Sequence, residues 1–206
     1  KLILVSVISV LLTILAAFLI VPRIVKENAK RGVIIQAIYR SNFVLFALPL
    51  STNIFGDSGA AIASAMIAII IPIYNIFAIM ILEYFRGDDI RVLPLLKRVL
   101  SNPMIFGALV GLVFIVLGIP LPACIEKPIA QFSDLTTPLA LFILGSTLHF
   151  SSLLDHAKYV IPTLAVKLFV LPACMLLVTL ALQFDPVSRF VYLTMFATPV
   201  AAASYP

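Results

Sequence analysis

The sequence is poor in charge: only 11% of its 206 residues are Asp, Glu, Lys or Arg, whereas 63% are hydrophobic. A soluble domain carries roughly a quarter charged residues, so this chain has too few to cover a surface that faces water. The scarcity excludes a soluble enzyme and a disordered chain, and it predicts that the lipid bilayer is the solvent. The first residue is Lys1 rather than methionine, and the last, Pro206, lies inside an apolar run. We therefore expect the chain to be a piece of a longer protein.

Residues that carry metal, disulfide or hydrolytic chemistry are scarce as well. The two cysteines, Cys124 and Cys174, fit neither a disulfide framework nor a metal motif. His149 and His156 have no third ligand near them in the sequence. Asp134 is the one acid within the apolar runs that could face a cavity, whereas an intramembrane hydrolase needs two aspartates at one depth or a serine with a base. We therefore expect no catalytic residue, no metal site and no cofactor.

Long apolar runs dominate what remains, and each approaches the 20 or so residues that a helix needs to cross a bilayer. None of them alternates polar and apolar residues as the strands of a membrane barrel do. We predict spans over residues 2–21, 33–55, 60–84, 103–119, 134–150 and 159–182, and a seventh that starts at residue 190. The expected fold class is an all-α polytopic membrane protein.

Basic residues gather in the connections between these runs. The segments 22–32 and 85–102 hold four Lys or Arg each, which places both in the cytoplasm by the positive-inside rule. The segment 151–158, with Lys158 and His156, is ambiguous by charge, although alternation of the spans also assigns it to the cytoplasm. The net charge of +5 is thus explained by membrane orientation, and we expect no nucleic-acid partner.

Two of the predicted spans are interrupted by proline in similar surroundings. Phe-Ala-Leu-Pro occupies residues 46–49 and Phe-Ala-Thr-Pro occupies residues 196–199, in spans that run in opposite directions. Proline frees backbone groups, and irregular backbone survives in a membrane only beside protein or a watery cavity. Two broken helices of opposite orientation are typical of inverted-repeat transporters, whose substrate sites lie there. Ordinary proline kinks, as expected at Pro72 or Pro162, are the alternative.

A few polar side chains lie inside the spans. A charge such as Arg40 is costly at that depth, so it either attracts an anion, pairs internally or snorkels to the interface. Asn42 could present its amide to a carboxylate, while Asn53 and Asn75 could line the same cavity or bond neighbouring helices. Lys167 could pair with a carboxylate, assist an anion or replace a coupling cation.

The order of several short motifs resembles the auxin efflux carrier family, in the bacterial branch that includes malonate and other organic-acid permeases. Arg40-Ser41-Asn42-Phe43, followed by Leu48-Pro49 and Phe55-Gly56, is similar to the fourth helix of that family. The likeness to the sixth to ninth helices is carried by Asn102-Pro103, by Thr137-Pro138-Leu139-Ala140-Leu141, by Lys167-Leu168 with Pro172, and by Ala197-Thr198-Pro199. One departure is Ala47, where many members have glycine.

The resemblance implies an inverted-repeat transporter of ten helices, of which helices three to nine are present here. The whole chain, residues 1–206, would be a fragment of one membrane domain. Residues 1–84 would be transport helices three to five with a crossover at Pro49. Residues 103–150 would be scaffold helices six and seven, and residues 159–206 transport helices eight and nine with a crossover at Pro199.

The function that the resemblance implies is secondary transport of a small organic anion by alternating access. The substrate would be a carboxylate such as malonate, malate or an auxin-like acid, carried across a cell membrane that we expect to be the bacterial inner membrane. Coupling to H⁺ or Na⁺ and assembly as a homodimer stay open. A sodium-coupled symporter of the bile-acid type and a membrane-embedded hydrolase are the alternatives. We expect the site to include Arg40, Asn42, Pro49, Asn53, Asn75, Lys167, Thr198, Pro199 and Ser204.

Overall fold

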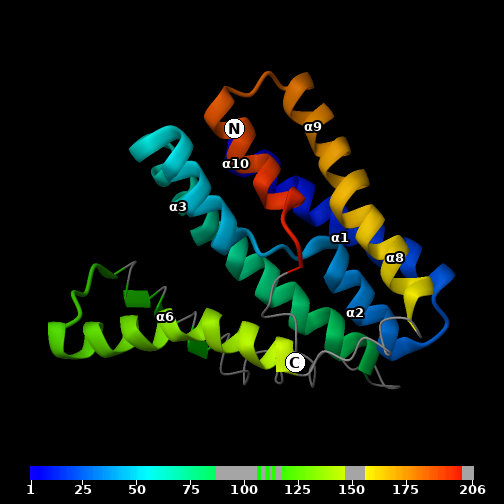
Figure 1. Ribbon diagram of the computed structural model, residues 1–206, viewed down its shortest axis with the longest axis horizontal. Helices are drawn as coiled ribbons and strands as arrows, with labels where there is room; N and C mark the ends of the chain where they lie inside the picture. Colours follow the sequence, from blue (N-terminus) through cyan, green and yellow to red (C-terminus); the bar gives the residue numbers. More distant parts are fainter. Residues whose placement is uncertain (87–105, 108–109, 112, 115–116, 147–155, 201–206) are drawn as a thin grey trace.

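The computed structural model describes residues 1–86, 106–107, 110–111, 113–114, 117–146 and 156–200, and every regular element in these ranges is a helix (Figure 1). Three described stretches are long and apolar enough to cross a membrane: Leu2–Ile24, Asn28–Phe85 and Ala157–Ala181. The second stretch contains two of the runs predicted as separate spans. The all-α polytopic class is therefore confirmed.

The first half of the chain builds three helices: α1 (Leu2–Ile24), α2 (Asn28–Tyr39) and α3 (Phe43–Arg86). The long α3 reverses at Gly56, where φ is 60° and ψ is −144°, a conformation that essentially only glycine adopts. A Cβ atom at Gly59 would collide with the carbonyl of Ser51, so this second glycine lets the two limbs approach closely. The tight turn expected at residues 56–59 thus makes α3 a helical hairpin, with an outgoing limb up to residue 55 and a returning limb from residue 57.

The last third of the chain builds one long span and a shorter helix. The span consists of α8 (Ala157–Ala165), a π-helical turn η1 (Val166–Val170) and α9 (Leu171–Ala181). After a sharp reversal at Gln183, whose φ is 50°, α10 runs over Pro186–Ala197. We expected a turn up to residue 189 and a helix from residue 190. The helix starts earlier because the Asp185 carboxylate accepts a hydrogen bond from the Ser188 amide and Pro186 occupies the first turn.

The middle of the chain is described mainly through α6 (Ala123–Ser146), which runs across the lower left of Figure 1, below α3. We expected residues 120–133 to form a connection and residues 134–150 to form the fifth span. Instead one helix covers most of both segments, because Pro128 and Pro138 are accommodated inside it. Only short stretches of the fourth predicted span, residues 103–119, are described, and the end of the fifth, residues 147–150, lies outside the described residues.

The two ends of the long helices show how the chain runs through the membrane. Lys1 donates a hydrogen bond from Nζ to the carbonyl of Leu182, which joins the start of α1 to the end of α9. At the other end, Lys30 of α2 and Lys158 of α8 both stand over the ring of Tyr159. The span α8–α9 therefore runs opposite to α1. The contacts also place residues 156–159 beside the basic connection that follows α1, so the two segments lie at the same end of the bundle.

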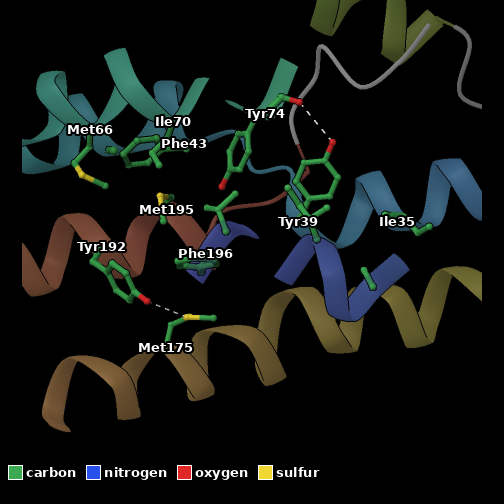
Figure 2. Close-up of a cluster of buried hydrophobic side chains, with 14 of the residues drawn as sticks. Ile35, Tyr39, Phe43, Met66, Ile70, Tyr74, Met175, Tyr192, Met195 and Phe196 are labelled. Carbon is green, nitrogen blue, oxygen red and sulfur yellow. Dashed lines mark hydrogen bonds between the residues drawn. The ribbon is translucent and has the colours of Figure 1, made fainter. Parts of the chain in front are cut away.

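A buried cluster fills the space between α2, α3 and α10, as Figure 2 shows. The rings of Tyr39 and Tyr74 lie 5.8 Å apart, and those of Tyr192 and Phe196 lie 5.3 Å apart. Tyr192 is also tied by its hydroxyl to Ser9 of α1, at 2.6 Å, and to the Met175 sulfur of α9, at 3.1 Å. The end of α10 is thereby held in the centre of the bundle.

Candidate functional site

The first interruption in the helices lies between α2 and α3. Arg40, Ser41 and Asn42 are non-helical, and Arg40 adopts an extended conformation with φ −79° and ψ 125°. Pro49 lies inside α3 with an exposed side chain, seven residues beyond the break. The crossover that we predicted at Pro49 is therefore wrong, because the helix continues through this residue. The helix tolerates that proline, as it tolerates Pro72, and the break occurs instead where three consecutive residues bond to distant parts of the chain.

The second interruption follows α10. The helix ends at Ala197, and Thr198 is extended, with φ −80° and ψ 152°. Proline disfavours the helical conformation of the residue before it, so Pro199 accounts for the end of the helix at this residue. Here a local feature of the sequence is sufficient to place the break.

The two interruptions contact each other. The backbone amide of Asn42 donates a hydrogen bond to the carbonyl of Pro199 at a distance of 2.8 Å. In Figure 1 the segment after α2 and the segment after α10 cross in the middle of the bundle. Within a membrane the backbone groups freed at a helix end must find partners in the protein. This bond satisfies one group from each interrupted helix and holds both breaks at one depth.

Two buried cations converge on the first break. Arg40, only 6% exposed, donates from Nη2 to the Asn75 side-chain oxygen at 2.8 Å. Lys167 is fully buried and donates from Nζ to the Ser41 hydroxyl at 2.6 Å. Its backbone belongs to the π-helical turn η1, a local widening that is frequent at functional sites. Within the described ranges, no carboxylate lies close enough to pair with either cation.

Two buried hydroxyl groups at the same place lack a hydrogen-bond partner. They are the Thr198 Oγ1 atom, in the second break, and the hydroxyl of Tyr74, which faces Ser41 from α3. Both side chains are at most 6% exposed. A buried polar group without a partner costs free energy, so such groups commonly mark a place where water or a ligand binds.

The structure brings together six of the nine residues expected in the site. Pro49 and Asn53 are exposed on the outgoing limb of α3, away from the break, and Ser204 lies outside the described residues. Sequence reasoning missed Ser41 and Tyr74. Ser41 had a signal, since it stands between two candidates, whereas Tyr74 had none beyond its position before Asn75. The residues brought together are Arg40, Asn42, Asn75, Lys167, Thr198 and Pro199.

The arrangement is suited to holding an anion. Two cations, an amide side chain and free hydroxyls surround the N-terminus of α3, whose unpaired amides and helix dipole also favour negative charge. A helical membrane domain in which two interrupted helices meet at a buried, positively charged centre is the architecture of a membrane transport protein.

Comparison with known families agrees with that class. The family described as membrane transport protein matches residues 1–205. The chain therefore belongs to this family, the auxin efflux carriers, which confirms the resemblance seen in the sequence motifs. No curated protein and no solved structure matches the chain at a significant level.

Proposed function

We propose that the protein is a secondary transporter for a small organic anion, bound where the two interrupted helices meet. The observation that carries the proposal is the pair of buried cations, Arg40 and Lys167, which are held by neutral groups alone among the described residues. An unneutralised charge is expensive at membrane depth. A carboxylate substrate would supply the missing negative charge, and the neutral partners Asn75 and Ser41 hold the cations in place for it.

The substrate class is a carboxylate such as malonate, malate or an auxin-like acid. Arg40 carries a planar guanidinium that matches the two oxygens of a carboxylate. Asn42 presents an amide beside it, and the hydroxyl of Thr198 has a hydrogen bond still to donate. Charge complementarity thus favours an anion, and the remaining donors favour one that is rich in oxygen.

Alternating access is the mechanism that we propose for the movement. The long helices α1 and α8–α9 run in opposite directions, and the interrupted helices enter the site from opposite sides of the membrane. Each break leaves a half-helix that ends at the site, so either side could open when this group of helices moves relative to the rest of the protein. The hydrogen bond between Asn42 and Pro199 would keep the two breaks together during that movement.

Uptake into proteoliposomes tests the function directly. The intact protein would be reconstituted and given a panel of labelled mono- and dicarboxylates under imposed pH, Na⁺ and voltage gradients. We expect saturable uptake of at least one carboxylate, and its dependence on each gradient would identify the coupling ion. Absence of uptake for every organic anion would refute the proposal.

Substitution of Arg40 tests the site. We expect Arg40→Gln to lower kcat/KM for uptake about 10- to 100-fold, since a hydrogen bond to a charged group contributes roughly 1.5–3 kcal/mol. Arg40→Lys keeps the charge and should retain more activity. Lys26→Gln, which removes a charge from the exposed connection after α1, is the matched control and should change little. Unchanged uptake by Arg40→Gln would remove this residue from the site.

A further inference from the structure

An apolar groove opens between α1, α2 and the span α8–α9, and no residue of the proposed substrate site lines it. Its volume is about 480 Å³, within the range of pockets that bind small ligands. Its walls are formed by aliphatic side chains at helical spacing, including Ala16, Ile20 and Ile24 of α1, Ile34 and Ile38 of α2, and Val166 of η1.

The two threonine hydroxyl groups in the walls already donate hydrogen bonds within their own helices. The hydroxyl of Thr13 donates to the Ser9 carbonyl at 2.7 Å, and that of Thr163 donates to the Tyr159 carbonyl at 2.7 Å. Both are hydrogen bonds within one helix, so the wall that remains is apolar along its length. The occupant that fits such a groove is a hydrocarbon chain.

The cytoplasmic end of the groove is different, because it is basic and aromatic. Lys158 and Tyr159 line it, and the ring of Tyr159 lies 4.9 Å from the Lys158 ammonium and 5.3 Å from that of Lys30. Lys30 also pairs with Glu27 at 2.7 Å, and this hydrogen bond lowers the pKa of the Glu27 carboxyl. Lys158 has no carboxylate within salt-bridge distance in the described part of the chain.

We infer that the groove binds an anionic phospholipid of the cytoplasmic leaflet. Its phosphate would lie between Lys158 and Lys30, and one acyl chain would extend along α1. From Val25 to Leu12 the groove follows 13 residues of helix, or about 20 Å. That length covers one leaflet of a hydrocarbon core about 30 Å thick. A basic headgroup position above an apolar slot is the complement of an anionic lipid.

The groove also adjoins the proposed substrate site through a single helical turn. Val166 and Val170 of η1 line the groove, whereas Lys167 between them reaches Ser41 at the first break. A lipid chain in the groove would therefore pack against the turn that positions Lys167. The lipid site itself rests on the groove and its basic end, and it does not depend on which substrate is transported.

Residues 1–206 contain no tryptophan, so within this part of the protein one introduced tryptophan reports on its surroundings alone. We would place it in the groove as Ile20→Trp and, as the matched control, on the exposed outer surface of α9 as Leu177→Trp. Each variant would be reconstituted in mixed vesicles of phosphatidylglycerol and phosphatidylcholine, with brominated chains on one lipid at a time. Bromine quenches tryptophan fluorescence at short range.

We expect brominated phosphatidylglycerol to quench the groove tryptophan more strongly than its mole fraction predicts. Each brominated lipid should quench the Leu177→Trp control in proportion to the mole fraction of that lipid. Lys158→Gln and Lys30→Gln should each weaken the preference about fivefold, while Lys26→Gln should leave it unchanged. Quenching that follows mole fraction at both positions would overturn the proposal, since the groove would then hold any bilayer lipid. Absence of quenching in the groove by either lipid would also overturn it, since a protein segment would then fill the space.

Discussion

The two helix interruptions perform the same structural task with different chemistry. The break after α2 carries Arg40 and receives Lys167 from the other half of the chain, and no proline lies in it. The break after α10 contains Pro199 and an uncharged Thr198. The first is therefore held open by side-chain bonds to other helices, the second by a local restriction on the backbone. In the described chain, both cations at the crossing are associated with the first break: Arg40 is part of it, and Lys167 donates a hydrogen bond to Ser41 within it.

This difference indicates a division of roles between the two breaks. The charged break would provide the attraction for an anion, while the proline break provides shape and the backbone carbonyl that the Asn42 amide binds. The bond between them makes one site from two dissimilar parts. Changes made on the two sides should therefore have unequal effects.

The largest difference is expected between Lys167→Met and Thr198→Val. The first removes a buried cation and the hydrogen bond that it donates to the Ser41 hydroxyl, so kcat/KM for uptake should fall about 10- to 100-fold. The second removes a hydroxyl that has no protein partner, and the fall should stay below about fivefold. Parallel uptake measurements on both variants test this. Equal losses would show that the two breaks contribute alike.

The link between the breaks is tested by replacing Asn42 with proline. Asn42→Pro removes the amide that donates to the Pro199 carbonyl and leaves that carbonyl without its protein partner, so we expect about a tenfold loss of uptake. Asn42→Ala keeps the amide and serves as the control for the side chain. If the two variants behaved alike, the side chain and not the link would account for the effect.

The hairpin in α3 turns at Gly56 and returns the chain beside the charged break. Gly56→Ala should lower the free energy of unfolding by about 1–3 kcal/mol, because alanine does not adopt the backbone angles found there. Gly145→Ala, in α6, is the control: nothing lies near the added methyl group. Thermal unfolding in detergent compares the two. Equal midpoints would mean that the turn relaxes without cost.

The smallest effect concerns the N-terminal end of α10. Asp185→Ala removes the N-cap and should destabilise the protein by about 1 kcal/mol, whereas Asp185→Asn should keep most of the cap. Hydrogen bonds from Ser188 lower the pKa of the Asp185 carboxyl in the folded protein. The stabilisation from its charge is therefore complete above the ordinary pKa near 4 and is lost as the pH falls through the lower folded value. The Asn variant should show a flatter stability profile below about pH 4.

Most of the fold could be predicted from the sequence. The run at 159–182 corresponds to the helical stretch Ala157–Ala181, and the reversal at Gly56 lies in the predicted turn. These features are local, since a membrane span depends on the apolar character of consecutive residues and a turn on the freedom of one glycine. The start of α10 was missed because a capping aspartate, rather than the first apolar residue, determines where that helix begins.

The site was only partly accessible to such reasoning. Arg40, Asn42 and Lys167 stood out because a polar or charged side chain inside an apolar run has few explanations. Pro49 and Asn53 were included because proline was taken as the sign of a break, and the break proved to be elsewhere. No local pattern marks Tyr74, whose hydroxyl reaches the site only because the returning limb of α3 packs beside α2 and α10.

By itself the sequence determined that the chain lies in a membrane, and it predicted which connections face the cytoplasm and which polar residues lie inside the spans, because each of these follows from the composition of short segments. Only the tertiary structure decided where the first helix breaks and which groups meet there. Lys167 and Ser41 are separated by 126 positions in the chain. The hydrogen bond between them forms because the span α8–α9 passes beside the break after α2.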